Sequence, residues 1–530
     1  MSSELFFRSE DLTQEEVLTH LVETDSDRKI VDSLKGRSPV ILRGSRGVGK
    51  SFLMRVAEVQ LSHALKEQRV LPVYVTFARA SLIAKPTPER FQAWMLAKIC
   101  NRLIRAAASF GFTLPAGSSI KAIRGTSSSN ISRLEAIEAQ LEESWKGVES
   151  SDDLTGVPDV DVLKDAVEDL CDAANLRRVN LFIDEAAHVF IPEQQRQFFT
   201  LMRDLRSPYI AVKAAVYPGA TAFGESFQMT HDATEMSVDR PIVEDDYARS
   251  MREIVYKQDD GYRKIIAREG EAFDTLAFAA TGNPRILLKT LSRSTPLNRR
   301  RVQEVVKSYY REEIWSEHSK LAERYPGHRQ LIDWGRSFME GNVLPALFER
   351  NEGRPHETSS HIWIHRDAPE VVREALRLLC YSGILQEGVS GIRATRSEIG
   401  TRYMVNLGCQ FALAKDPVVY GTEVRRLLSI KRMVEFGANH PAFRAIQNFS
   451  LDGLESSNNE ALRARLEAPA SKLDVTQFQH KKLGELGLKT IGQVLAAGED
   501  TFKKAHYVGP TRARQMRNAA VAAVLEYLSG

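Results

Sequence analysis

The chain has 530 residues, of which 43% are hydrophobic and 27% are charged. This composition is typical of a folded globular protein, and the length exceeds one ordinary hydrophobic core, so several domains are expected. The formal net charge is only +3, which excludes a polycation and means that any nucleic-acid surface must be local.

The cysteines and the N-terminal segment bear on the compartment. The four cysteines are far apart and form no CxxC pair, which argues against a disulfide framework or a zinc ribbon and favours a reducing compartment. The segment MSSELFFRSEDLTQEE carries acids where a secretory signal carries bases and an apolar run. No stretch approaches the roughly 18 uninterrupted apolar residues of a membrane span. We therefore expect a cytoplasmic protein without a membrane partner.

Residues 40–53, VILRGSRGVGKSFL, predict a strand, a phosphate-binding loop and the start of a helix. The GxxxxGK[ST] template is matched in full, and its glycines let backbone amides face phosphates at a helix N-terminus. Lys50 is expected to contact the β- and γ-phosphates, and Ser51 to offer its hydroxyl to Mg²⁺. The predicted nucleotide-binding residues of this loop are Gly44, Gly47, Val48, Gly49, Lys50, Ser51 and Phe52.

Residues 70–76 predict the second strand, and 90–107 predict a helix. The segment from about 111 to 160 is rich in Ser and Gly, interrupted by a predicted helix at 131–145. We interpret it as a surface insertion within an ATPase core that spans residues 1–243.

A second nucleotide-related element follows at 179–185, where an apolar strand ends in Asp184 and Glu185. This is the pattern of a Walker B element, in which Asp184 holds the metal through water and Glu185 polarises the attacking water. By themselves the letters DEAAH at 184–188 suggest a helicase, but the remaining helicase motifs are not apparent. A guanine-reading NKxD motif and an ABC-type LSGGQ signature are not apparent either. ATP with Mg²⁺ is therefore the expected ligand, and the expected activity is that of a slow, regulatory ATPase.

The next elements are a helix at 193–206, a buried strand at 209–216 and a short strand at 235–238. Residues 244–325 are predicted to form a helical lid. Within it, Gly282 and Asn283 end one helix and Pro284 begins another, as capping chemistry predicts. Arg285 is thereby placed on the first turn of a lid helix.

This order of motifs resembles the AAA+ and STAND ATPases, most closely the branch similar to origin-recognition-complex initiator ATPases, over about residues 20–410. The resemblance implies an α/β P-loop fold with a parallel sheet. In that branch a Gly-Asn-Pro-Arg segment carries the sensor-2 arginine, which implies that Pro284 and Arg285 contribute to the nucleotide site and that Arg285 contacts the γ-phosphate. A surface arginine on a capped helix is the alternative.

The chain departs from the family at sensor 1. An Asn is usual there, whereas this sequence offers Lys213 within the fourth strand and Tyr217 after it. The arginine finger is also not assigned by the sequence. Its candidates are Arg203, Arg206 and Arg240.

Residues 326–440 are predicted to form a winged-helix-like domain. A strand at 361–365 leads to a helix over 369–380, and two strands are expected around a turn at 388–391. In initiator-type ATPases this module often binds DNA, and in STAND relatives it often braces the ATPase. The helix mixes glutamates with arginines, which is not a phosphate-binding face, so both interpretations stay open.

Residues 441–470 are predicted to be a polar linker, and 471–530 a separate helical domain with two helix-hairpin-helix patterns. The pair resembles the C-terminal domain of the RNA polymerase alpha subunit, although Tyr507 stands where many hairpins have a glycine. This domain has nine Lys or Arg against five Asp or Glu, and its hairpin at Pro510 exposes a helix N-terminus. DNA binding through phosphate contacts is predicted, with protein docking as the alternative. The predicted DNA contacts are Lys503, Lys504, Gly509, Thr511, Arg512 and Arg514.

Neither motor elements nor a second set of catalytic residues is apparent. The expected function is an ATP-binding and ATP-hydrolysing switch that binds DNA and controls the assembly or recruitment of a protein partner. Replication or transposition control and anti-phage defence all fit this description. The alternative is a STAND-type protein-sensing scaffold whose ATP-dependent assembly does not involve DNA. The resemblance also implies a possible homo-oligomer.

Overall fold

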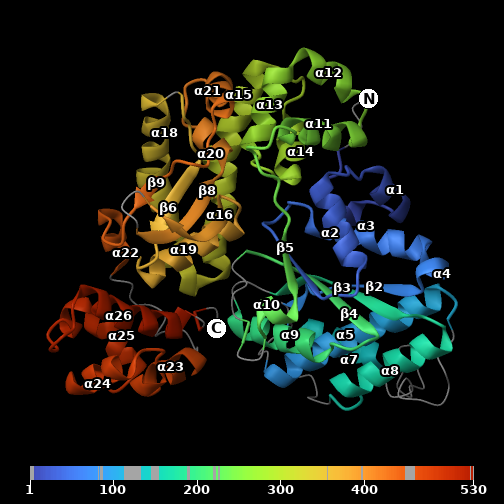
Figure 1. Cartoon of the computed structure of the whole chain (residues 1–530), viewed down its shortest axis with the longest axis horizontal. Coiled ribbons are helices and arrows are strands. Elements are labelled where there is room, and N and C mark those ends of the chain that lie inside the picture. Colours follow the sequence, from blue (N-terminus) through green and yellow to red (C-terminus); the bar gives the residue numbers. More distant parts are fainter. Residues whose placement is uncertain are drawn as a thin grey trace. The chain divides into compact units, whose positions relative to one another are not determined.

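The structure is a computed structural model, which describes residues 5–80, 83, 87–112, 133–144, 154–187, 191–218, 223–224, 227–354, 356–394, 398–447, 460–525 and 527–528. The chain divides into two compact units. The first comprises Met1–Arg240, Arg249–Tyr262 and Asn283–Leu288, and the second comprises Pro241–Ala248, Arg263–Gly282 and Lys289–Gly530. Figure 1 shows the elements of both units.

The first unit is built on a five-stranded sheet in the order β2-β3-β4-β1-β5, in which every pairing is parallel. Four of these strands were expected near their observed positions, and the short strand predicted at 235–238 is β5. Because the strands are parallel, their carboxyl ends share one edge of the sheet, where ligands bind in open α/β sheets. The strands are β1 (Val40–Arg43), β2 (Val70–Thr76), β3 (Arg178–Ala187), β4 (Ile210–Val216) and β5 (Thr234–Ser237).

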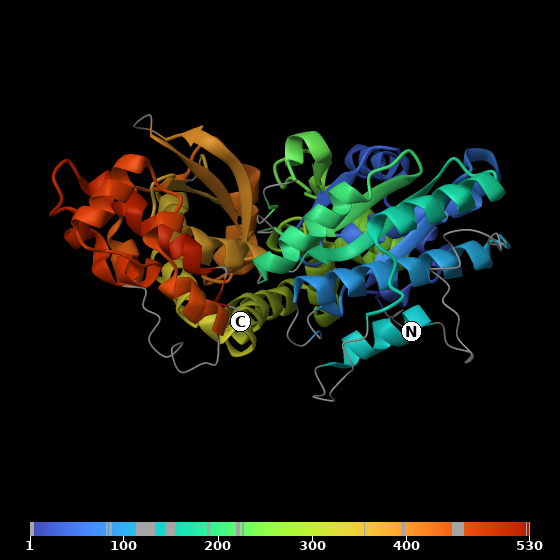
Figure 2. The ribbon, with the colours of Figure 1, turned by 90° about the horizontal axis from the view of Figure 1, so that it is seen from below.

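Helices cover both faces of this sheet, as Figure 1 and Figure 2 show. Successive residues of β1 face opposite layers: Ile41 packs in one hydrophobic cluster, and Val40 and Leu42 pack in the other. This double burial explains why the strands are continuous apolar runs. One layer holds α5 (Pro88–Ser109), α7 (Arg133–Glu143), α8 (Val160–Ala173) and α9 (Pro192–Asp204), and the other holds α1 (Gln14–Thr19), α2 (Asp25–Lys35) and α3 (Lys50–His63).

The described part of the predicted insertion includes α7, which is fastened to α5 by a buried polar cluster. Lys98 of α5 donates to Glu138 at 3.1 Å and also to Glu142. Glu142 accepts further hydrogen bonds from Arg79 at 2.8 Å and from Trp94 at 3.3 Å. The other predicted parts of the insertion, at 113–132 and 145–153, lie outside the described residues.

The predicted lid region is helical, and α14 begins at Pro284 as expected. The helix α14 runs from Pro284 to Arg293, so its first residues belong to the first unit and the remainder to the second. The helix α11 is also divided, but in the opposite sense: its first two residues belong to the second unit and the remainder to the first. The helices of this region are α11 (Tyr247–Gln258), α12 (Tyr262–Arg268), α13 (Gly270–Ala279), α14, α15 (Arg299–Ser308) and α16 (Ile314–Arg324). The region predicted to be the winged-helix-like domain begins with α17 (Arg329–Phe338) and α18 (Leu344–Gly353).

The second unit contains a four-stranded sheet in the order β7-β8-β6-β9. A helix followed by a two-stranded hairpin was predicted, and α19 (Glu370–Tyr381) is followed by the antiparallel pair β7 and β8. Strand β9, which pairs in parallel with β6, was not predicted. The strands are β6 (His361–His365), β7 (Leu385–Arg393), β8 (Ile399–Val405) and β9 (Val434–Phe436), and the helices α20 (Leu407–Phe411), α21 (Pro417–Arg426) and α22 (Arg444–Gln447) follow β8.

The predicted position of the hairpin turn is wrong. Residues 388–391 lie inside β7, which continues to Arg393, and β8 begins at Ile399. The pairing of β7 with β8 shifts register on both sides of Ser390, and Gly391 has a φ of +77°. The glycines that suggested a turn therefore serve β-bulges inside a longer strand.

The charges of α19 are satisfied largely within the helix. Arg373 donates to Glu370, and Arg377 donates to Glu374 with a 2.8 Å hydrogen bond from Nε. The same helix packs against α17 and α26, and Asn518 of α26 accepts from the Glu370 backbone amide at 3.0 Å. These contacts lie within the second unit, so bracing of the ATPase and DNA binding both stay predictions.

The C-terminal segment is helical throughout its described part. Its helices are α23 (Glu460–Glu467), α24 (Gln477–Glu485), α25 (Ile491–Phe502) and α26 (Pro510–Leu525). Gly498, at a φ of 69° and ψ of 165°, divides α25 into two shorter helices, near the boundary predicted between the two hairpin patterns. Part of the predicted linker, 448–459, lies outside the described residues.

Candidate nucleotide-binding site

The phosphate-binding loop connects β1 to α3, and the side chain of Lys50 is turned back into it. The Lys50 ammonium donates to the carbonyl oxygens of Gly44 at 2.5 Å and Ser45 at 3.1 Å. The helix α3 begins at Lys50, so its N-terminal amides face the loop. Burial, opposed by the nearby carboxylates of Asp184 and Glu185, lowers the pKa of Lys50 to about 8.

The Gly-Asn-Pro-Arg segment lies directly on this loop. Asn283 caps α14 by accepting from the Ile286 amide at 3.2 Å, and its side-chain nitrogen donates to the Arg46 carbonyl at 2.8 Å. Gly47 has a φ of +90°, and a Cβ added there would lie 2.8 Å from Asn283 Oδ1 and 2.9 Å from Arg285 Cβ. Glycine is therefore required at this position, because both the backbone conformation and the close approach of α14 exclude a side chain.

Two tyrosines hold the two acids that end the apolar part of β3. The Tyr74 hydroxyl on β2 donates to Asp184 Oδ2 at 2.7 Å, and the Tyr217 hydroxyl after β4 donates to Glu185 Oε1 at 3.0 Å. The Lys50 ammonium lies over the Tyr217 ring, 4.4 Å from its centroid. Burial raises the pKa of Tyr74 well above its usual value, so this hydroxyl stays a donor to Asp184.

The structure separates the two sensor-1 candidates. Lys213 is fully buried in β4 and donates to the carbonyls of Ser33, at 3.2 Å, and Ser38. These acceptors lie beside the C-terminal end of α2, so Lys213 faces away from the phosphate-binding loop. Burial lowers the pKa of Lys213 to about 7. Tyr217, in contrast, lines the same cavity as Lys50 and Glu185.

The three arginine-finger candidates have partners within the first unit. Arg240 donates to the Val48 carbonyl at 2.7 Å and pairs with Asp27 at 3.3 Å, which braces the phosphate-binding loop from outside. Arg203 pairs with Asp204, and Arg206 lies 3.7 Å from Asp232. None of these contacts identifies one of the three residues as the arginine finger.

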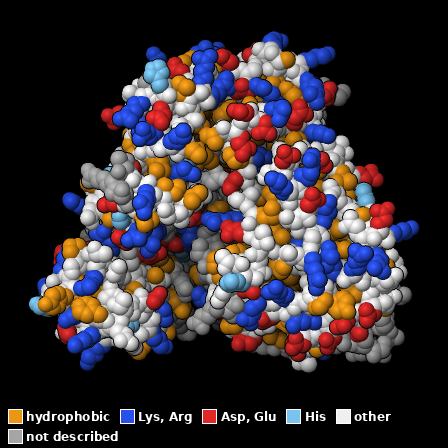
Figure 3. Space-filling view, viewed as in Figure 1, with side chains coloured by type: hydrophobic (Ala, Val, Ile, Leu, Met, Phe, Trp, Pro, Cys, Tyr) orange, Lys and Arg blue, Asp and Glu red, His pale blue; other side chains and the backbone are white. Residues whose placement is uncertain are grey.

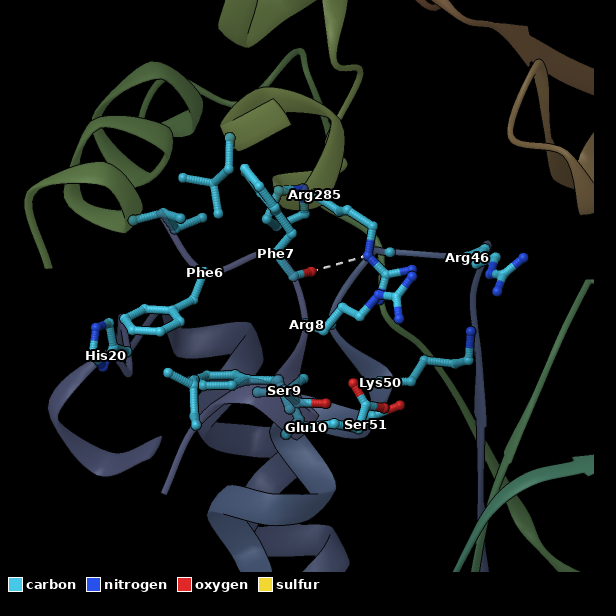
Figure 4. Close-up of a pocket in the computed structure, with 18 of the residues that line it drawn as sticks. Phe6, Phe7, Arg8, Ser9, Glu10, His20, Arg46, Lys50, Ser51 and Arg285 are labelled. Carbon is cyan, nitrogen blue, oxygen red and sulfur yellow. Dashed lines mark hydrogen bonds between the residues drawn. The ribbon is translucent and has the colours of Figure 1, made fainter. Parts of the chain in front are cut away.

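An N-terminal segment that sequence reasoning missed completes the cavity. The backbone of Phe6 pairs twice with the side chain of Gln258 on α11, at 2.9 Å and 3.0 Å. Arg285 Nε donates to the Phe7 carbonyl at 3.0 Å (Figure 4). The one signal in the sequence was the pair of adjacent phenylalanines, Phe6 and Phe7, in a polar stretch. Their neighbours in the chain did not predict where this pair would lie.

Together these elements enclose a cavity of about 290 Å³. In Figure 4 the side chains of Lys50, Arg46 and Arg285 lie on one side of it, and Phe6 and His20 lie on the other. The cavity therefore has a cationic end beside the two acids and an end lined by aromatic and apolar groups. Its other lining residues include Ser51, Phe52, Asp184, Glu185, Tyr217 and Pro284.

Of the six predicted DNA contacts of the C-terminal domain, one is buried and five are exposed. Arg514 is only 8% exposed and donates to the carbonyls of Asp367 and Ala438 and to Asn439 Oδ1. It also pairs with Glu499. Because these acceptors use its guanidinium, Arg514 is not placed to contact a phosphate, and the prediction for this residue is corrected. Exposed positions are found at Lys503, Lys504, Gly509, Thr511 and Arg512.

Within the described part of the chain, no helix has the length and apolar content to cross a bilayer. Among the same residues, no cluster of three or more His, Cys, Asp or Glu side chains is placed to hold a metal ion. A metal at Ser51 and Asp184 would therefore depend on oxygens supplied by a ligand, as is common for Mg²⁺.

Comparisons with known proteins give little to add to this geometry. No protein-family model matches the sequence, and no curated protein matches it. Among solved structures, similarity is found to the Aeropyrum pernix ORC1 protein in complex with DNA, at 16% identity and a TM-score of 0.32. The alignment covers 77% of this chain and 97% of that chain.

Proposed function

We propose that the chain is an ATP-binding and ATP-hydrolysing switch of the AAA+ type that acts on DNA. The observation that carries the proposal is the meeting of four groups in one cavity. These are Lys50 of the phosphate-binding loop, the acids Asp184 and Glu185 at the end of β3, and Arg285 of α14. A metal-bound triphosphate is the ligand whose charges match this set.

The residues present fit MgATP. Lys50, Arg46 and Arg285 offer positive charge to the phosphates, and the N-terminus of α3 adds backbone amides. Ser51 and Asp184 would hold Mg²⁺, which would supply charge neutralisation between the phosphates. The opposite end of the cavity, with Phe6 and His20, offers the flat apolar surroundings that a nucleobase requires.

For hydrolysis we assign the role of general base to Glu185. Its carboxylate takes a proton from the water that attacks the terminal phosphorus, and the bond to the leaving diphosphate oxygen breaks. Tyr217 holds one carboxylate oxygen of Glu185, which leaves the other available to orient the water. We therefore propose Tyr217, rather than Lys213, in the sensor-1 role, as a positioning residue.

The output of the switch is proposed to be DNA binding through the C-terminal domain. Exposed Lys503, Lys504 and Arg512 would contact phosphates, together with the Gly509 and Thr511 region at the start of α26. Control of a protein partner's assembly, in replication, transposition or anti-phage defence, would follow from the nucleotide state. Assembly of several copies of the chain is part of this proposal.

A protein-sensing scaffold that does not use DNA is the second candidate. It is favoured by the burial of Arg514 and by the internal pairing of charges on α19, because both reduce the phosphate-binding surface. Binding of duplex DNA by the full chain and by a protein ending near Ala470 separates the candidates. Loss of affinity and of salt dependence on truncation supports DNA binding by the C-terminal domain. Unchanged binding means that this domain is not the DNA contact, and failure of the full chain to bind DNA supports the scaffold.

The catalytic proposal is tested with Glu185→Gln. This change keeps the size and polarity of the side chain but removes the base. We expect ATP affinity within about twofold of the parent and turnover reduced by about 100-fold or more. Lys50→Ala is the comparison variant and should lose ATP binding itself. Equal turnover by Glu185→Gln and the parent would remove the assignment of Glu185.

A further inference from the structure

The C-terminal domain presents an aromatic side chain that folding does not require. Tyr507 lies between α25 and α26 at a φ of +65°, a region that bulky residues rarely adopt. Its side chain is 75% exposed, the highest value among the exposed large hydrophobic residues of the described chain. A glycine would adopt this backbone at lower cost, and an exposed ring buries little apolar surface. The Tyr507 ring therefore has a role other than stabilising the fold.

Tyr507 belongs to a group of four side chains from three segments, which we name the aromatic–basic cluster: Phe478, His506, Tyr507 and Arg512. The Arg512 guanidinium lies 4.9 Å from the centroid of the Phe478 ring, and its Nη1 donates to the Tyr507 carbonyl at 2.7 Å. The rings of His506 and Tyr507 meet edge to face with centroids 4.1 Å apart. Phe478 on α24 is itself 37% exposed.

Positive charge surrounds this cluster. Lys503 and Lys504, which lie just before the cluster, and Lys481 on α24 are exposed. Lys503 also pairs with the exposed Asp500 at 3.0 Å. Within the C-terminal domain the excess of bases over acids, nine against five, is larger than the excess of the whole chain. Figure 3 shows hydrophobic side chains beside Lys, Arg and His on the surface of the domain formed by α23–α26.

We propose that the aromatic–basic cluster binds single-stranded DNA by stacking an unpaired base on Tyr507 while the lysines and Arg512 hold the backbone. This inference rests on the proposed function of the C-terminal domain and specifies its ligand. Exposed rings interleaved with cations are the chemistry of single-strand sites, because every base offers a flat π-face. In a duplex these faces are covered by neighbouring base pairs, so Tyr507 adds nothing to duplex affinity.

The test measures fluorescence anisotropy of the full-length protein with a labelled oligothymidine of about 16 nucleotides and with a duplex of the same length. The variants are Tyr507→Gly, which removes the ring and relieves the backbone, and Tyr507→Phe, which keeps the ring. We expect Tyr507→Gly to weaken oligothymidine binding by about 5- to 150-fold. Duplex affinity should change by less than about twofold, and Tyr507→Phe should behave like the parent.

Lys504→Gln provides the control for the charge. This variant should bind both the oligothymidine and the duplex more weakly, and the salt dependence of both affinities should be reduced. If Tyr507→Gly binds oligothymidine as the parent does while Lys504→Gln is weakened, the stacking inference is overturned and the DNA function of the domain stands. If both variants and the protein ending near Ala470 bind both ligands as the parent does, the DNA function fails as well, and protein docking takes its place.

Discussion

At the phosphate-binding loop, the positive charge of Lys50 depends on pH. Its pKa in the free protein is lowered to about 8 by burial, and a bound triphosphate raises it again through its negative charge. ATP affinity should therefore be full below a pH of about 8 and fall by up to about tenfold per pH unit above it. Calorimetric titration of ATP across this range measures the effect.

Lys50→Arg is the control for this prediction, because a guanidinium keeps its charge at every pH used. Its affinity should be lower than that of the parent, owing to the different shape of the donor group, but should not fall above a pH of about 8. A parent affinity that is constant through this range would show that Lys50 stays charged and would contradict its lowered pKa.

The two tyrosines that hold the acids should have separate effects. Tyr217→Phe removes the hydrogen bond to Glu185 but keeps the ring beneath Lys50, so turnover should fall by about 10- to 100-fold with little change in ATP affinity. Tyr74→Phe removes the support of Asp184 and should instead raise the Mg²⁺ concentration that is needed, by about 10- to 100-fold. Steady-state hydrolysis with varied ATP and Mg²⁺ distinguishes them. Identical behaviour of the two variants would contradict the separate roles.

At the scale of elements, α26 is fixed to its surroundings by Arg514 while its neighbour Arg512 stays exposed. Arg514→Met would leave two backbone carbonyls and Asn439 without their donor, and we expect a loss of about 1–3 kcal/mol in the free energy of unfolding of this region. Hydrogen exchange of α26 measures it. Arg512→Met is the comparison variant: it removes a single backbone acceptor contact, to the Tyr507 carbonyl, and should reduce protection less than Arg514→Met does. Equal protection in both variants would mean that Arg514 does not fasten α26.

The parts of the site that sequence could predict depend on local chemistry. The loop ending in Lys50, the acids near the end of β3 and the start of α14 at Pro284 are each set by residues close together in the chain. The partners of these groups could not be predicted, because Tyr74 meets Asp184 across 110 positions of sequence and Arg285 meets Phe7 across 278. Such contacts follow from packing of the whole unit.

The same distinction explains the two errors. The hairpin turn was placed at glycines that instead accommodate bulges, since local composition does not reveal the register of a partner strand. Arg514 was assigned to DNA because it is one of the basic residues close in sequence to the helix N-terminus at Pro510. A helix turns about 100° per residue, however, so Arg512 and Arg514 point to different faces. Which face of a helix is buried depends on tertiary packing, which the local sequence does not reveal.

At the scale of the whole molecule, α14 is the element through which nucleotide state would reach the remainder of the chain. Its first turn carries Arg285 and lies on the phosphate-binding loop, and its later residues belong to the second unit. A ligand that binds Arg285 shifts the equilibrium of the second unit only as far as it binds the two states of the protein with different affinities. The aromatic–basic cluster and the exposed lysines belong to that second unit.

The most direct test of the switch is the affinity of Glu185→Gln for DNA, measured by fluorescence anisotropy with and without MgATP. Because this variant should hold ATP without consuming it, we predict that MgATP changes its DNA affinity. Adding Arg285→Ala should abolish that change while ATP binding is retained. A DNA affinity that is the same with and without MgATP in Glu185→Gln would contradict the account.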